Sequence, residues 1–165
     1  VLSLDKGEEL RSTDFPDALP VAINYQSDGS LHLVADTFLG ILSKDFSDQK
    51  KIPFQQQLKM YRFTDYGTFW ASTSENEVSF NLSFVQSNGE RQIIRLRSAV
   101  TDVSLSKEGI AVLAGGRLYQ YDFSWEPKLT RQVSTDVFKI VWNGKQVYTL
   151  SASLLDVLPA WEAGG

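Results

Sequence analysis

Short runs of alternating apolar and polar residues dominate this chain, and they predict β-strands. The clearest runs cover residues 21–25, 78–84 and 94–97, where apolar side chains recur at every second position. A period of two places one set of side chains on a buried face and the other set in solvent. Residues 54–60 are the best candidate for a helix, but they follow Pro53 and are interpreted as a strand. The sequence therefore predicts an all-β fold.

The strands recur in units that each turn on a glycine. Four apolar strands lead through a polar residue or a tyrosine to a glycine and then to a second apolar strand; the glycines are Gly29, Gly67, Gly109 and Gly144, spaced 38, 42 and 35 positions apart. Glycine adopts the positive φ of tight hairpins at little cost. Each unit then continues through two more strands, the last of them polar and expected near residues 51–56, 91–97 and 128–133. The units are predicted at residues 16–57, 58–98, 99–133 and 134–158 of a single domain covering residues 1–165.

Four antiparallel strands per unit of this length resemble the WD40-like β-propeller family, in which each unit is one blade. The resemblance covers residues 16–158 and is carried by the spacing, because the Gly-His and Trp-Asp dipeptides of well-matched repeats are absent. Tyr121-Asp122, Leu155-Asp156 and Ser43-Lys44-Asp45 stand near the positions where Trp-Asp is expected. The resemblance implies a propeller of about four blades. A β-trefoil, which uses three such units, and an open sandwich are the alternative folds.

Four blades make a small ring, and the last predicted unit lacks a fourth strand after Leu158. Two arrangements explain this. Residues 1–13 supply an outer strand that completes the last blade, or another chain or segment completes a larger ring. Residues 159–165 are predicted to form a tail.

Composition adds limits on compartment and partners. The 165 residues are 42% hydrophobic and 22% charged, with a formal net charge of −4, which suits a folded domain and argues against a broad nucleic-acid surface. Residues 1–80 carry seven Lys and Arg against twelve Asp and Glu, whereas residues 81–165 carry nine against eight. The absence of Cys excludes disulfides and thiolate metal sites, and it favours a cytoplasmic location. No apolar run approaches the ~20 residues of a membrane span.

The sequence offers few groups for catalysis. His32 is the only histidine, it alternates with leucines on an expected strand, and it is interpreted as structural. No cofactor or metal site is predicted. Propeller glycosidases use paired acids, and Asp14, Asp17, Asp102 and Asp136 stand where first strands begin. Asp at a turn also bonds its own backbone, and this structural role is the favoured interpretation. A carbohydrate-active or carbohydrate-binding propeller is the alternative.

Repeats without a catalytic constellation favour a non-catalytic protein–protein interaction scaffold within a larger complex. The residues expected to contact another protein subunit lie in opening loops or outside strand alternation: Asp14, Phe15, Tyr61, Asp102, Trp125, Asp136 and Trp161. Arg91, Arg95 and Arg97 form a basic patch on one predicted outer strand. This patch is interpreted as a charged edge that resists aggregation, with nucleic-acid binding through Arg95 and Arg97 as the alternative.

Overall fold

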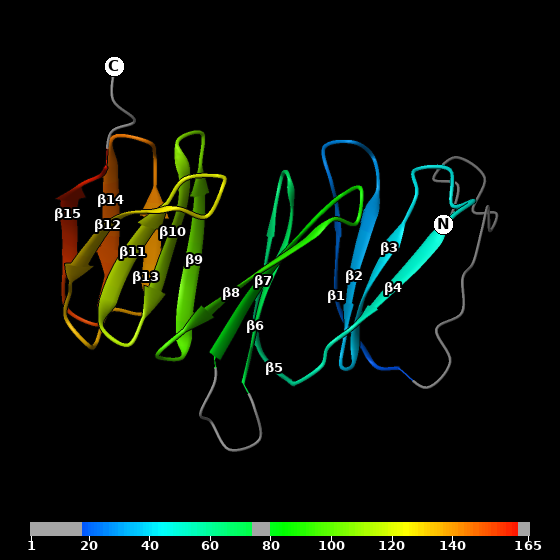
Figure 1. Cartoon of the computed structure of the whole chain (residues 1–165), viewed down its shortest axis with the longest axis horizontal. Helices are drawn as coiled ribbons and strands as arrows, with labels where there is room; N and C mark the ends of the chain where they lie inside the picture. The colour runs from blue at the N-terminus through cyan, green and yellow to red at the C-terminus, as the bar shows by residue number, and fades with distance from the viewer. Residues whose placement is uncertain (1–17, 74–79, 162–165) are drawn as a thin grey trace.

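The computed structural model describes residues 18–73 and 80–161, which form fifteen β-strands in four antiparallel sheets and contain no helix. The all-β prediction is therefore confirmed. The four sheets follow one another in chain order along the long axis of the molecule, from β1–β4 at the right of Figure 1 to β13–β15 at the left. We call them blades one to four. Separate stacked sheets exclude the trefoil and sandwich alternatives for these residues, and the propeller prediction is confirmed.

Each blade is a meander in which consecutive strands pair. Blade one contains β1 (Pro20–Tyr25), β2 (Leu31–Ala35), β3 (Phe38–Leu42) and β4 (Gln49–Pro53). Blade two contains β5 (Gln57–Thr64), β6 (Gly67–Thr73), β7 (Phe80–Gln86) and β8 (Arg91–Leu96). Blade three contains β9 (Val100–Ser106), β10 (Gly109–Ala114), β11 (Arg117–Tyr121) and β12 (Pro127–Gln132). Blade four contains β13 (Lys139–Trp142), β14 (Gln146–Leu150) and β15 (Leu155–Pro159).

Two details differ from the sequence-based expectation. Residues 54–56 connect blades one and two, and the strand begins only at Gln57. Blade four has three strands among the described residues, and residues 1–13, which were expected to complete it, lie outside them.

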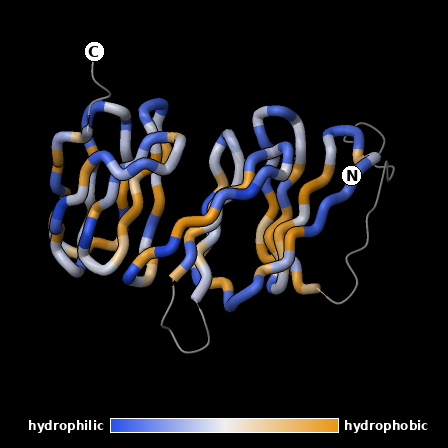
Figure 2. Tube along the Cα trace, viewed as in Figure 1, coloured by the Kyte–Doolittle hydropathy of each residue, from blue (hydrophilic) through white to orange (hydrophobic). Residues whose placement is uncertain are grey.

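Hydrophobic clusters join each blade to the next. Val34 and Leu39 of blade one pack with Trp70 and Val85 of blade two. Phe69 and Phe84, on the other face of blade two, stack with ring centroids 4.4 Å apart and pack against blade three. The third cluster joins blades three and four. The buried core thus lies between the sheets. The loops at the top of the view in Figure 2 are mostly hydrophilic.

The first strands of blades two, three and four approach one another, with β9 next to both β5 and β13. First strands converge in the same way around the centre of a propeller. We therefore call them inner strands. They bring side chains from three blades together, and the buried Asp102 lies among them.

Gly67 and Gly109 occupy matching places, each directly after a two-residue hairpin loop and at the start of the second strand of its blade. Both have φ of +154°. A Cβ on Gly67 would lie 2.2 Å from the backbone oxygen of Val85, and one on Gly109 would lie 2.1 Å from that of Tyr121. These glycines are thus required by close approach of the third strand as well as by backbone conformation.

His32 lies in the interface of blades one and two, where its side chain is fully buried. Its Nδ1 is 2.7 Å from the hydroxyl of Thr68 in blade two. Burial disfavours the charged imidazolium and lowers the pKa of His32 to about 4, although the nearby Asp28 carboxylate opposes this shift. The structural interpretation of this histidine agrees with its position.

This pKa predicts acid destabilisation that depends on one residue. In the unfolded chain His32 takes up a proton near pH 6.5, whereas in the folded protein its pKa is about 4. The contribution of the neutral, buried His32 to folding stability is therefore complete above pH 6.5 and is lost as the pH falls toward 4. The loss is up to about 3 kcal/mol. Urea unfolding at pH 7.5 and pH 4.5 should show a smaller difference for His32→Gln than for the wild type. An equal difference in both proteins would contradict the assignment, because the chain has no other histidine.

Candidate interaction surface

Asp102 lies on the inner strand β9, and its side chain is only 4% exposed. One carboxylate oxygen pairs with the Arg62 guanidinium from β5 of blade two. The other accepts a hydrogen bond of 2.9 Å from the backbone N–H of Ile140 in β13 of blade four, and the Lys139 ammonium lies 3.6 Å away. One carboxylate therefore connects the inner strands of three successive blades.

Ser104 repeats this contact two residues further along β9, because its hydroxyl oxygen accepts the N–H of Trp142 at 2.9 Å. Asp102 and Ser104 thus receive alternate backbone N–H groups of β13, which otherwise pairs only with β14. Asp102 was predicted to contact a partner protein. Its side chain is instead occupied within the stack, and we leave it out of the proposed binding surface.

The other residues predicted near opening loops fall into three situations. Asp14 and Phe15 lie outside the described residues. Tyr61 is 36% exposed and packs edge-to-face against Phe63, with ring centroids 5.6 Å apart. Asp136 is exposed and accepts a hydrogen bond from the Ser134 hydroxyl. The described members of this set do not gather at one place.

Trp125 lies in the loop between β11 and β12 and has a positive φ of +65°, which is unusual for a large side chain. Its indole N–H donates to Gln92 in blade two. Its ring centroid lies 5.8 Å from that of Tyr121 and 6.2 Å from that of Phe69. The side chain thus caps the core between blades two and three, which leaves it half-buried rather than free for a partner.

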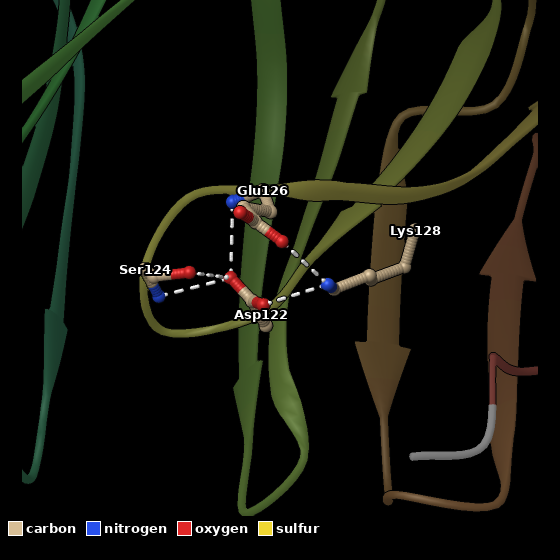
Figure 3. Close-up of polar contacts among 4 residues, drawn as sticks. All are labelled: Asp122, Ser124, Glu126 and Lys128. Atoms are coloured by element: carbon tan, nitrogen blue, oxygen red, sulfur yellow. Dashed lines mark hydrogen bonds and ion pairs between the residues drawn. The ribbon is translucent and has the colours of Figure 1, made fainter. Parts of the chain in front are cut away.

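The strained turn that holds Trp125 is organised by Asp122 (Figure 3). One carboxylate oxygen accepts the hydroxyl and the N–H of Ser124, at 2.6 and 2.9 Å, and the N–H of Glu126 at 2.9 Å. Lys128 lies 2.9 Å from the other oxygen. Hydrogen bonds from Ser124 and Lys128 hold the pKa of Asp122 well below its usual range. Asp122, which stands near the expected Trp-Asp position, is therefore a turn-forming residue.

The same Asp-x-Ser pattern recurs in two loops of blade one. Asp28 accepts the N–H and hydroxyl of Ser30, and Asp45 accepts those of Ser47. This local pattern predicts a turn from the sequence, because an Asp side chain readily accepts a hydrogen bond from the backbone two residues on, although these two loops were not predicted from it. The pattern stabilises these loops.

Trp161 is the last described residue and lies against blades three and four. Its backbone N–H donates to the buried Gln120 side chain at 2.6 Å, and the Lys128 ammonium lies 5.7 Å from its ring centroid. The ring is half-buried. Like Trp125, Trp161 extends a core between blades.

The predicted basic patch is divided by the structure. Arg91 lies over the Trp70 ring at 4.8 Å and donates to the Ser83 hydroxyl at 3.1 Å, and burial lowers the pKa of its guanidinium. Arg95 is exposed on β8, and Arg97 is exposed in the bend that follows this strand. Only two of the three guanidiniums are thus directed to solvent, which is few for phosphate-backbone binding.

A groove of about 390 Å³ runs along inner strands β5, β9 and β13. Asp65 is the only carboxylate among its lining residues, so the groove lacks the acid pair of a glycosidase. Among residues 18–73 and 80–161, no three His, Cys, Asp or Glu side chains gather as metal ligands. No helix in this part of the chain is long and apolar enough to span a membrane.

The outward side of blade four carries several exposed apolar side chains. Strand register places Val141, Tyr148 and Val157 in one row across β13, β14 and β15, and Lys139, Leu150 and Leu155 in the next. We call this side the terminal face; its exposed apolar side chains are Val141, Leu150, Leu155 and Val157, each 39–60% exposed.

The opposite side of blade four is also apolar, but it is buried. Ile140, Trp142 and Val147 alternate with the terminal-face residues and are at most 3% exposed, because blade three covers them. Both sides of this sheet therefore carry apolar side chains, but among the described residues another blade packs against one side and not the other. A contiguous exposed apolar patch of this kind is typical of a protein interaction site.

A second uncovered apolar row lies at the other end of the stack. Leu19, Val21, Ile23 and Tyr25 alternate along and just before β1 and are 52–71% exposed. We call them the first-strand row. They point away from blade two, since Asn24 shares its register with His32, which faces that blade. On the same outward side of blade one, Leu31, Leu33 and Leu42 are at most 9% exposed, so the exposed apolar row of this side is confined to β1 and the residue before it.

The sequence matches no family model and no curated protein. Solved structures resemble the fold. The BBS1N chain crystallised in complex with ARL6DN matches with a TM-score of 0.64 at 12% identity, over 90% of this chain and 54% of that chain. The AfRom2 CNH domain matches with a TM-score of 0.61 at 8% identity, over 87% and 56%. A chain of the nidogen/laminin complex matches with a TM-score of 0.62 at 10% identity, over 96% and 66%.

These structures are β-propellers, and at such low identity the likeness concerns the fold alone. The chain spans about half the length of the first two structures and two thirds of the third. A propeller fold hosts many unrelated functions. The function of this chain is therefore inferred from its own surface.

Proposed function

We propose that the protein is a non-catalytic interaction scaffold within a larger protein complex, and that the terminal face is its main binding surface. The exposure of Val141, Leu150, Leu155 and Val157 carries this proposal. The inter-blade clusters are buried between neighbouring blades, whereas the apolar residues of the terminal face have no cover among the described residues. Burial of such a surface yields about 25 cal/mol for each Å² removed from water.

Two further observations support a scaffold. The groove along the inner strands lacks an acid pair, and Asp102, the more buried of the two described candidate acids, is held by Arg62 and by the backbone of Ile140. A carbohydrate-active site and a nucleic-acid surface are accordingly less well supported. The similar BBS1N structure is of a propeller in complex with a protein, and binding of a protein partner is the role proposed for this chain.

Site-specific photo-crosslinking tests the proposal. A photoreactive amino acid replaces Val157 on the terminal face in the full chain, produced in its natural cells. The matched control replaces Ile93 on β8. Like Val157, Ile93 is a β-branched residue on the last strand of its blade, and the two side chains are 49% and 48% exposed. We expect a discrete cross-linked protein species from position 157 and none from position 93. Equal cross-linking, or none, at the two positions would contradict the proposal.

A further inference from the structure

The sequence contains an asparagine followed by glycine twice, as Asn88-Gly89 and as Asn143-Gly144. The first pair lies in the loop between β7 and β8, and the second lies in the loop between β13 and β14. We propose that the second pair is a self-modification site, at which Asn143 loses its side-chain amide and becomes aspartate or isoaspartate. This inference goes beyond the proposed function and does not depend on it.

The reaction is an attack of the chain on its own side chain. The backbone nitrogen of Gly144 bonds to Cγ of Asn143 and gives up its proton, while the bond from Cγ to Nδ2 breaks and ammonia leaves. A cyclic imide remains. Water, the only co-reactant, then adds to one of the two imide carbonyl carbons and opens the ring. One opening gives aspartate, and the other gives isoaspartate, in which the main chain runs through the former side chain.

The attacking nitrogen is in a different state at the two sites. Among the described residues the Gly144 N–H makes no hydrogen bond, whereas the Gly89 N–H donates to the Gln86 carbonyl oxygen at 2.8 Å. The Gly89 nitrogen must therefore break a hydrogen bond before it can lose its proton. Both glycines are buried and both asparagines are exposed, so hydrogen bonding rather than exposure distinguishes the two sites.

The carboxamide oxygen of Asn143 is held by two backbone donors. Its Oδ1 accepts the N–H of Lys145 at 3.0 Å and the N–H of Gln146 at 2.9 Å. Attack at Cγ places negative charge on this oxygen, and two N–H groups already at this distance stabilise the charge as an oxyanion hole does. The Oδ1 of Asn88 accepts a single N–H, from Glu90 at 2.9 Å, within the described part of the chain.

A phenol lies beside the leaving amide. The Tyr148 hydroxyl oxygen is 3.4 Å from Nδ2 of Asn143, and the hydroxyl donates to the Gln146 side chain at 3.0 Å. Once Cγ is tetrahedral, Nδ2 becomes an amine with a lone pair, and the hydroxyl can supply the proton with which ammonia departs. The proton released by Gly144 restores the phenol through water. The turn thus combines a nucleophile, an oxyanion hole and a proton donor.

The modification would alter the end of the inner strand β13. Isoaspartate adds one carbon atom to the main chain directly after Trp142, whose N–H donates to Ser104 of blade three at 2.9 Å. The new carboxylate would also lie in a turn that contacts Glu108, because a Cβ on Gly144 would be 3.5 Å from Glu108 Cγ. Both changes weaken the contact between blades three and four, so modified protein should unfold at lower urea concentration than fresh protein.

Peptide mapping by mass spectrometry tests the inference in the full chain, with Asn88 as the internal control. The protein is incubated at mildly alkaline pH, in buffer and in concentrated urea, and the modified fraction at each asparagine is followed over time. In the folded chain Asn143 should react at least about tenfold faster than Asn88, because only Asn143 has two oxyanion donors. In urea the two rates should become similar, since only the local sequence remains.

Tyr148→Phe tests the proton donor. This change removes a hydroxyl and should slow the modification of Asn143 about tenfold without affecting Asn88. Tyr119→Phe, at another half-buried tyrosine, should leave both rates unchanged. Urea unfolding checks that both variants remain folded. Three results would each overturn the proposal: equal rates at the two asparagines in the folded chain, a preference for Asn143 that persists in urea, or an unchanged rate in Tyr148→Phe.

Discussion

Replacing Asp102 with alanine is expected to lower the free energy of unfolding by about 3 kcal/mol, since breaking a buried ion pair from one side leaves its partners without compensation. The change removes the acceptor of the buried Ile140 N–H and the counter-ion of Arg62. Both groups belong to other blades, so the loss affects two inter-blade contacts at once. Equilibrium unfolding in urea measures the effect as a shift of the midpoint with an unchanged slope.

Asp136→Ala is the matched control, because the same residue type stands there at the entry to the next blade. Asp136 is exposed and accepts only the Ser134 hydroxyl among its described partners. Its removal should cost less than about 1 kcal/mol. Equal losses in the two variants would show that the inner-strand network around Asp102 contributes no more than an ordinary turn.

This pair of residues illustrates a limit of sequence interpretation. Thr101-Asp102-Val103 and Thr135-Asp136-Val137 read alike, and both were assigned to a binding surface. The fold separates them, because Asp102 lies within β9 between two other inner strands whereas Asp136 precedes β13. Burial by a neighbouring blade is a long-range property, and no local pattern in the sequence encodes it.

The strands themselves were largely predictable. Alternation and turn glycines are local signals, and they indicated the polar fourth strands close to β4, β8 and β12. The segment after Pro53 was harder to predict, because Leu58 and Met60 fit a strand but Gln55 and Gln56 lie in the connection between two blades. Connections of this kind depend on where the next sheet packs, which short-range patterns do not determine.

The roles of the two tryptophans depended on the same long-range packing. Trp125 and Trp161 stand outside strand alternation, a position that suits either an interface or the edge of a core. The structure places both between blades, with Trp125 fixed by Gln92 of the preceding blade. The terminal face was not predicted, because Val141 and Val157 resemble any strand residues until the stack shows that nothing described covers them.

Gly109→Ala is expected to lower the free energy of unfolding by roughly 3 kcal/mol, through two effects that act together. The backbone at φ +154° is unfavourable for any residue with a side chain. The added methyl group would also lie 2.1 Å from the Tyr121 carbonyl oxygen, so β10 and β11 must move apart in a sheet that holds the blade together. Urea unfolding again measures the loss.

Gly29→Ala separates the two effects. Gly29 also has a positive φ, +83°, but the nearest atom to an added Cβ is the Lys44 Cβ at 3.3 Å, a side-chain contact that small adjustments relieve. This variant should lose only about 1 kcal/mol, the ordinary cost of placing alanine in a left-handed turn. Gly67→Ala should instead resemble Gly109→Ala, since its Cβ would lie 2.2 Å from the Val85 oxygen. If all three variants lost the same stability, backbone conformation alone would explain the glycine repeat, and the close approach of the third strand would have no energetic role.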